Sequence, residues 1–198
     1  NSDLKLTHHA TGLINDISIT DSSHVYRPSA IDLLLNTTPD TTYMRTQSGD
    51  FIVKLDASGN YEQLLNQFML LGDSAMAQLD RKTIDQPALR KLLPTMRMTV
   101  ESKRENPVAT FLKASADVDF KEMLFDLSTS VEQGVNGRGF INSLMVSDVR
   151  IDTINFSLTQ RKERLSFGGQ VRNNKKNPQF VFNALFDGII QERGATLG

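Results

Sequence analysis

Residues 149–171, VRIDTINFSLTQRKERLSFGGQV, decide the expected fold. Apolar and polar side chains alternate in two runs that are joined by a charged turn, Gln160 to Arg164. Alternation with a period of two is typical of a strand with one buried face, so the stretch predicts a β-hairpin. An isolated two-stranded ribbon is only marginally stable in water. We therefore expect this hairpin to belong to a larger antiparallel sheet.

The first strand of this hairpin is expected to be bent. Its apolar positions change parity between Ile151 and Ile154. Because successive side chains of a strand point to opposite faces, one face stays apolar throughout only if the strand is distorted. The sequence thus predicts a bulge or a twist near Asp152-Thr153.

Further strands are expected on both sides of the hairpin. Turn residues such as Thr38-Pro39-Asp40 and Ser48-Gly49-Asp50 separate similar alternating runs. The expected strands cover residues 30–36, 41–46, 51–55, 95–101, 118–120, 123–127, 140–146 and 179–186, with two shorter runs within 4–19. Between 118–120 and 123–127 the apolar positions change parity, which indicates either a bulge or a partly helical segment. Asn136-Gly137 has the chemistry of a hairpin turn. Residues 192–198 show no pattern and are expected to fray.

Two parts of the chain change from a strand period to a helical one. Asn60 precedes apolar residues with helical spacing and has Gln63 three residues later, which predicts a capped helix. A second helix is expected to start at Asp85 and to end before Pro94, and Asn106-Pro107 predicts a third, shorter one. We place these helices at about 60–93 and 106–113.

Together these elements predict an α+β, β-rich fold. We expect a large curved antiparallel sheet of repeated hairpins, with two or three helices packed on its apolar face. The length of 198 residues suits one large domain. Residues 1–198 are expected to form a single β-rich domain, or a fragment of a longer protein, with a helical insertion at about 60–113.

Composition excludes several functional classes. The formal net charge of -1 argues against a general nucleic-acid binder, which would carry a basic excess. The absence of cysteine excludes disulfides, thiolate metal sites and cysteine nucleophiles. The N-terminal residues lack the pattern of a signal peptide, and no stretch has the roughly 18 consecutive apolar residues of a membrane-spanning helix.

The sequence contains no pattern that indicates catalysis. Adjacent His8 and His9 would point to opposite faces of a strand, so with His24 they do not predict a metal site. No nucleophile elbow, phosphate loop or dinucleotide fingerprint occurs. A hydrolase is a further option for function, and it would need two carboxylates that converge in a cleft. We expect a protein that is not an enzyme and that needs neither a cofactor nor a metal.

Two sets of residues are candidates for binding. Apolar side chains of the strands would line a groove: Ile151, Ile154, Phe156, Leu158, Leu165, Phe167, Val171, Met96 and Met98. Basic side chains in two loops, which would lie at the two ends of one ribbon, would contact anionic headgroups: Arg161, Lys162, Arg164, Lys175 and Lys176, together with Arg172. The structural alternatives are core filling by methionine and charged loop tips that keep sheet edges soluble.

Three segments resemble the AsmA-like superfamily, and most of all the TamB-type translocation and assembly module proteins of Bacteroidetes. They are TTYMRTQSGDFIVKLDASGNYEQLLNQF (41–68), ENPVATFLKAS (105–115) and GVNGRGFINSLMVSDVRIDTINFSLTQRKERLSFGGQV (134–171). The resemblance implies a periplasmic protein of a Gram-negative envelope, anchored in the inner membrane by an N-terminal helix that is absent here. It also implies a long curved sheet whose apolar groove carries phospholipid or aids outer-membrane protein assembly.

The helices depart from that family's plain succession of strands, and they would plug the apolar face. The leading hypothesis is a non-catalytic periplasmic segment of an envelope-biogenesis protein, whose partners are phospholipid acyl chains or outer-membrane assembly proteins. It would associate with a membrane only through segments outside this chain. The main alternative is a periplasmic or cell-surface β-rich module that binds glycan or protein. Exposed aromatic residues would favour the alternative, but the chain has no tryptophan and three tyrosines.

Overall fold

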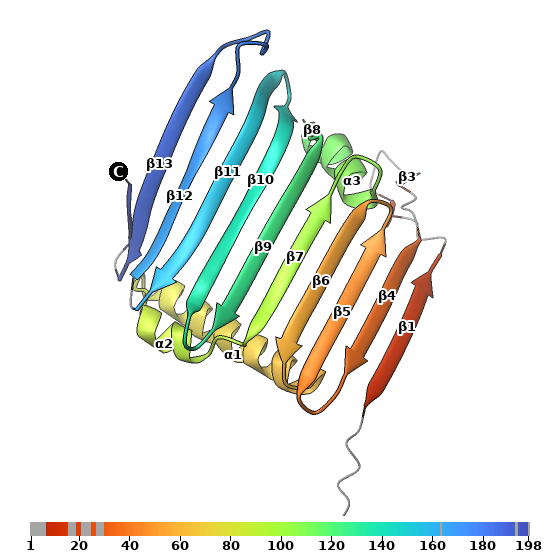
Figure 1. Ribbon diagram of the computed structural model, residues 1–198, viewed down its shortest axis with the longest axis vertical. Coiled ribbons are helices and arrows are strands. Elements are labelled where there is room, and N and C mark those ends of the chain that lie inside the picture. Colours follow the sequence, from red (N-terminus) through yellow and green to blue (C-terminus); the bar gives the residue numbers. More distant parts are fainter. Residues whose placement is uncertain are drawn as a thin grey trace, which may run out of the picture.

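The computed structural model describes residues 7–15, 19–20, 25–26, 30–162, 164–192 and 194–197. Most of these residues belong to an open antiparallel sheet, and the described chain also contains three helices (Figure 1). Strands make up 55% and helices 21%. The predicted α+β, β-rich fold class is therefore confirmed.

The strands and helices have the following bounds. The main strands are β1 (His8–Ile14), β4 (Ile31–Thr37), β5 (Thr41–Ser48), β6 (Phe51–Ser58), β7 (Met96–Ser102), β8 (Val118–Asp119), β9 (Glu122–Ser130), β10 (Gly134–Val146), β11 (Val149–Arg161), β12 (Arg164–Asn173), β13 (Phe182–Gln191) and β14 (Gly194–Leu197). The helices are α1 (Tyr61–Asp80), α2 (Gln86–Lys91) and α3 (Pro107–Ala116). A separate two-stranded ribbon consists of β2 (Ile19–Thr20) and β3 (Val25–Tyr26). Leu4, Leu6 and Ile17, in the first expected strands, lie outside the described residues.

Twelve of the described strands form one antiparallel sheet. Eleven of them lie in the order β1-β4-β5-β6-β7-β9-β10-β11-β12-β13-β14, and β8 pairs with β10 beside this path. Strand order thus follows chain order, with α1 and α2 between β6 and β7 and with α3 between β7 and β8. The first two helices and the third lie at opposite ends of the strands (Figure 1).

The pairing register gives the sheet two chemically different faces. Residues directly opposite each other on neighbouring strands share a face. Leu55 of β6 lies opposite Met98 of β7, which lies opposite Leu127 of β9, and this side is called the apolar face. The next residues along these strands, such as Arg97 and Asp126, belong to the other side, the polar face.

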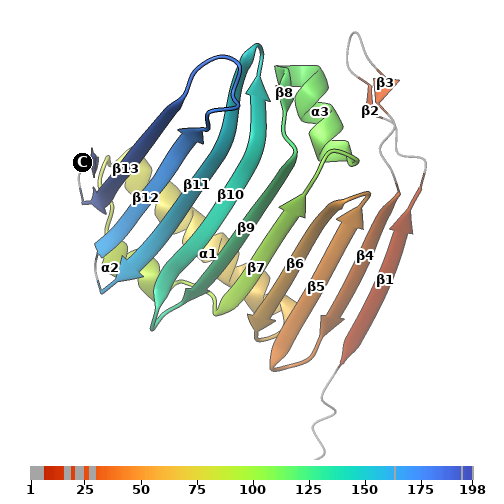
Figure 2. The ribbon, with the colours of Figure 1, turned by 45° about the horizontal axis from the view of Figure 1, so that its top comes forward.

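Helix α1 begins where the sequence predicts it. The Asn60 side chain accepts a hydrogen bond from the backbone N of Gln63 (2.9 Å), and the Gln63 side chain accepts one from the backbone N of Asn60 (3.2 Å). This capping box pairs two backbone donors that the first turn would otherwise leave free. Leu64 then packs against Leu55, Ala57 and Met96 of the apolar face. Figure 2 shows α1 crossing behind the strands.

Helix α2 holds two neighbouring turns of the sheet together. The guanidinium of Arg90 donates to the backbone carbonyls of Val131 (2.7 Å) and Lys162 (2.5 Å), and also to that of Glu132. Because these carbonyls belong to the β9–β10 and β11–β12 turns, one side chain links the ends of four strands. The helices predicted at about 60–93 and 106–113 are present, with a break at 81–85 between α1 and α2.

Two predictions about turns and ends are wrong. Asn136-Gly137 lies inside β10, and the turn that precedes this strand covers residues 131–133. Gly137 is paired on both sides, with Leu127 and with Leu158, so it serves close packing between strands rather than a turn. Gly194–Leu197 is also not frayed, because β14 pairs with the edge of β13 and gains hydrogen bonds that no sequence pattern reveals.

The distortion expected near Asp152-Thr153 occurs opposite these residues, in β10. Ser143 has φ = 52°, in the left-handed region, and interrupts the ladder. The register pairs Asn142 with Thr153 and Leu144 with Ile151 but omits Ser143 and Asp152 between them. No residue is inserted in β11 itself, so of the two predicted distortions the bulge is absent from this strand, and a twist there stays a prediction.

We expect Leu64→Ala to lower the free energy of unfolding by about 3 kcal/mol, because it leaves a cavity between α1 and the apolar face. Leu64 is 5% exposed. The matched control is Leu65→Ala on the same helix, since Leu65 is 57% exposed and its truncation should change stability by less than about 0.5 kcal/mol. Urea unfolding followed by circular dichroism measures both, and equal effects would contradict this packing of α1.

The polar face generates a prediction about pH. Arg97 donates two hydrogen bonds to Asp126, at 3.0 and 2.8 Å, which holds the pKa of this carboxyl below its ordinary value. A carboxyl with a lowered folded-state pKa stabilises the fold above its unfolded pKa of about 3.9, and this contribution disappears as the pH falls through the folded pKa. The stability advantage of the wild type over Asp126→Asn should therefore shrink between about pH 5 and pH 2 in urea titrations. An advantage that does not change with pH would contradict the pairing.

Candidate functional site

Two consecutive rows of residues on the apolar face cross ten strands, from β1 to β13. The first row consists of Ala10, Leu35, Met44, Leu55, Met98, Leu127, Gly137, Leu158, Phe167 and Gly188. The second row consists of Gly12, Leu33, Thr46, Val53, Val100, Phe125, Gly139, Phe156, Gly169 and Phe186. At about 4.8 Å between neighbouring strands, the rows extend roughly 43 Å. We call these two rows the apolar band; Thr46 is its one polar member.

The apolar band is not sealed by the rest of the described chain. Among its larger side chains Leu55 alone is buried, while the others are half-buried or, as with Leu33 (37%), exposed. Helix α1 buries Leu64 against the sheet but leaves Leu70 and Met76 exposed to solvent. A contiguous exposed apolar surface of this extent is typical of a binding site and not of a closed core.

Glycines on the apolar band make room for phenylalanine rings on neighbouring strands. A methyl group at Gly139 would collide with the ring of Phe156, and one at Gly169 would lie 2.5 Å from the ring of Phe186. Gly188 stands in the same relation to Phe167. Each ring therefore lies over a glycine, an arrangement that protects the exposed backbone. We call the surface that these three rings form, Phe156, Phe167 and Phe186, the aromatic floor.

The structure brings most of the predicted groove residues to this face. On the apolar face lie Ile154, Phe156, Leu158, Leu165, Phe167, Val171, Met96 and Met98. Ile151 lies three residues from Ile154 on β11, and alternation therefore places it on the polar face. Met96 is buried beside Leu64 in the core cluster. Contact of any of these residues with a ligand stays a prediction.

Sequence reasoning missed the members of the band outside the opening hairpin and β7. Val53, Phe125 and Phe186 lie on the band, and each belongs to an alternating run. The alternation could have shown that each strand has an apolar side. It could not have shown that these sides join into one surface, because this depends on the register between strands.

The predicted basic residues lie at the two ends of β11 and β12. At one end, Arg161, Lys162 and Arg164 surround the β11–β12 turn. At the other end, the loop after β12 carries Lys175 and Lys176, and Arg172 lies near the end of β12. All six are exposed. The two groups are thus separated by the full length of the ribbon and do not form one patch.

Buried amides hold the loop that carries Lys175 and Lys176. Asn173 accepts a hydrogen bond from the backbone N of Asp152 (2.8 Å) and donates to the carbonyl of Arg150 (3.0 Å). Asn177 donates to the Asp152 carboxylate at 3.3 Å. These bonds satisfy the backbone of β11 where its pairing with β12 has ended, so the loop is fixed against the strand.

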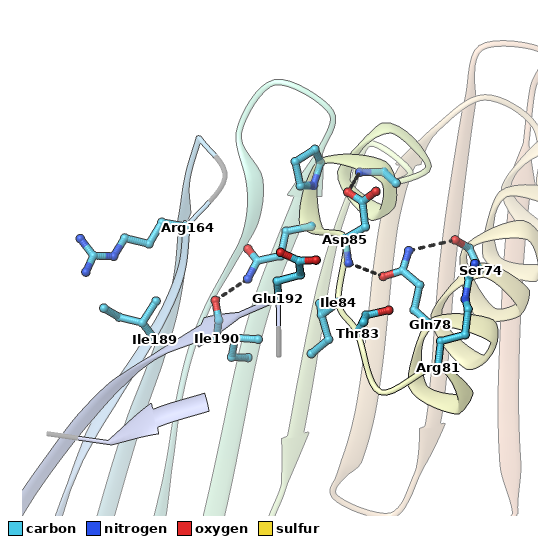
Figure 3. A pocket seen from close by; sticks show the side chains of 13 residues that line it. Ser74, Gln78, Arg81, Thr83, Ile84, Asp85, Arg164, Ile189, Ile190 and Glu192 are labelled. Atoms are coloured by element: carbon cyan, nitrogen blue, oxygen red, sulfur yellow. Dashed lines mark hydrogen bonds between the residues drawn. The ribbon is translucent and has the colours of Figure 1, made fainter. Parts of the chain in front are cut away.

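A polar hollow of about 970 Å³ lies beside the band, between the C-terminal part of α1, helix α2 and the end of β13 (Figure 3). Four charged residues line it: Arg81, Asp85, Arg164 and Glu192. The apolar side chains of Ile189 and Ile190 line it as well.

The described residues include no cluster of three histidine or acidic side chains that would hold a metal ion. His9 hydrogen-bonds Asn36, His8 packs edge-on against Tyr61 at 6.4 Å between ring centroids, and His24 lies outside the described residues. None of the helices described combines the length and hydropathy needed to cross a membrane. Hydrogen bonds to a neighbouring carboxylate raise the pKa of Tyr61, Arg97 and Lys113, and the bond from Arg97 lowers the pKa of Asp126.

We expect Gly139→Ala to lower the free energy of unfolding by about 2 kcal/mol, because the methyl group has no space beneath Phe156. Gly72→Ala on α1 is the matched control. Nothing lies within 4 Å of the position of its new methyl group, so it should raise stability by about 1 kcal/mol through helix propensity. Thermal unfolding measures both changes. A neutral Gly139→Ala would show that the ring does not occupy this position.

No protein-family model matches the chain, and comparisons with curated proteins and with solved structures give no significant match. The resemblance to AsmA-like proteins therefore rests on the three segments quoted from the sequence, and function has to be argued from the apolar face itself.

Proposed function

We propose that this chain is a non-catalytic module that binds phospholipid acyl chains on its apolar face. In this proposal it is a periplasmic segment of a TamB/AsmA-like envelope-biogenesis protein, and it takes part in phospholipid transport between membranes or in outer-membrane protein assembly. The observation that carries the proposal is the apolar band, which crosses ten strands and remains half-exposed.

The chemistry of the two faces supports binding on one side. The polar face carries ion pairs such as Arg97 with Asp126 and Lys54 with Glu101, which suit contact with water. The apolar face carries rings and aliphatic side chains that gain free energy when an apolar ligand removes them from water, at about 25 cal/mol per Å². A lipid tail meets this requirement and needs no specific hydrogen bonds.

The dimensions of the band suit acyl chains. A bilayer's hydrocarbon core is about 30 Å thick, so one acyl chain extends about 15 Å. The band is roughly 43 Å long and therefore has room for more than one chain along its length. The described sheet is open, and the band runs from its edge strand β1 to β13, the neighbour of the other edge strand β14.

One observation favours a second candidate function, which is the binding of a protein segment. Helix α1 lies against the apolar face through Leu64, so this face accepts an apolar helical side chain within the chain itself. An amphipathic helix of a partner would be recognised in the same way. This candidate corresponds to a β-rich protein-binding module.

We expect Phe186→Gln to weaken binding of a fluorescent fatty acid about tenfold, because it replaces part of the aromatic floor by a polar amide. The matched control is Leu185→Gln on the same strand. Leu185 is 74% exposed and points to the opposite face, so this change should leave binding unaltered. Circular dichroism confirms that both variants are folded before binding is measured.

Native mass spectrometry of the purified protein provides the direct test. Bound phospholipid in the wild type, reduced in Phe186→Gln, supports the proposal. If neither extracted phospholipid nor added fatty acid binds, the lipid function is wrong. Binding of an amphipathic peptide without lipid binding would favour the second candidate instead.

A further inference from the structure

We infer that the polar hollow beside the band binds the headgroup of a phospholipid that carries a primary amine, as phosphatidylethanolamine does. This inference rests on the proposed function, because it places the acyl chains of the same lipid on the apolar band. It adds a headgroup class and a site that the apolar face alone does not specify.

An unpaired buried oxygen is the first observation. Gln86 is 6% exposed and lines the hollow, and its Nε2 donates to the backbone carbonyl of Ile190 at 2.5 Å (Figure 3). Its Oε1 has no hydrogen-bond partner among the described residues. A buried amide oxygen is destabilising unless it accepts a hydrogen bond. In this inference the oxygen accepts a hydrogen bond from an N–H or O–H donor bound in the hollow that Gln86 lines.

The neighbouring Gln78 differs from Gln86 in that its side-chain oxygen is paired. Gln78 lines the same hollow and is buried to a similar extent, at 5% exposed. Its Oε1 accepts from the backbone N of Asp85 (2.7 Å), and its Nε2 donates to the Ser74 hydroxyl (3.5 Å). Both of its polar groups are thus paired within the chain.

The charges around the hollow have both signs. Arg81 supplies a guanidinium group, which suits a phosphodiester, whereas the Arg164 side chain extends away from the hollow (Figure 3). Asp85 and Glu192 supply carboxylates, which suit an ammonium group. Figure 3 shows Arg164 and Ile189 on one side of the hollow and Ser74, Gln78 and Arg81 on the other. A ligand with both a positive and a negative group fits this lining better than a purely anionic one.

The hollow is continuous with the apolar face. Ile190 lines the hollow and pairs with Leu165, and both lie on the apolar face one row away from the band. Gly188 and Phe186 follow on the same face of β13. A headgroup in the hollow would therefore have its acyl chains directed over Ile190 toward the aromatic floor.

Two short-chain lipids with identical acyl chains test the inference. Phosphatidylethanolamine and phosphatidylcholine have the same net charge, but the quaternary ammonium of choline has no N–H to donate. We expect the ethanolamine lipid to bind about tenfold more tightly, the effect of one hydrogen bond with a charged donor. In Gln86→Leu this preference should disappear, whereas in Gln170→Leu, which changes the polar face of β12 away from the hollow, it should remain. Isothermal titration calorimetry below the critical micelle concentration measures the affinities.

Each outcome decides one claim. Equal affinity of the wild type for both lipids overturns the headgroup site and leaves acyl binding intact, whereas binding of neither lipid overturns the proposed function as well. Tighter binding of phosphatidylglycerol than of both other lipids overturns the zwitterionic assignment. If Gln86→Leu does not fold, Glu192→Gln replaces it, since Glu192 is exposed and its neutralisation should reduce the ethanolamine preference severalfold. An unchanged preference in a folded variant overturns the role of the residue that was changed.

Discussion

The register between neighbouring strands is the constraint on which the rest of this structure depends. Each strand has an apolar and a polar side, but a shift of one residue in any pair would turn part of the apolar side to the polar face. The observed pairing keeps all apolar sides together from β1 to β13. The capped helix α1 can cover part of the resulting surface with Leu64 because that surface is continuous.

Local chemistry was enough to predict most elements. Asn60 with Gln63, and Asn106 with Pro107, predicted helix starts because capping depends on residues next to each other in the chain. The hairpin of β11 and β12 followed from alternation in the same way. The turn predicted at Asn136-Gly137 is wrong. In β10, Gly137 pairs with Leu127 of the neighbouring strand and leaves space for its side chain, so the position depends on a cross-strand contact and not on adjacent residues.

The candidate site was harder to predict for the same reason. Its apolar half was visible strand by strand, but the pairing of Gly139 with Phe156 joins residues far apart in sequence. The hollow was not visible at all, since it arises where α1 and α2 meet the end of β13. The unpaired oxygen of Gln86 depends on the exact position of the Ile190 carbonyl, which alternation does not encode.

The agreement between strand order and chain order has a consequence for how such a sheet is built up. Each strand contacts mainly the strands before and after it, as the repeats of a solenoid contact their neighbours. The free energy of folding is then close to a sum of nearest-neighbour contributions, and separation of the sheet begins at its outer strands. A hairpin added or lost in evolution would change the length of the apolar band by a fixed step, without requiring a new core.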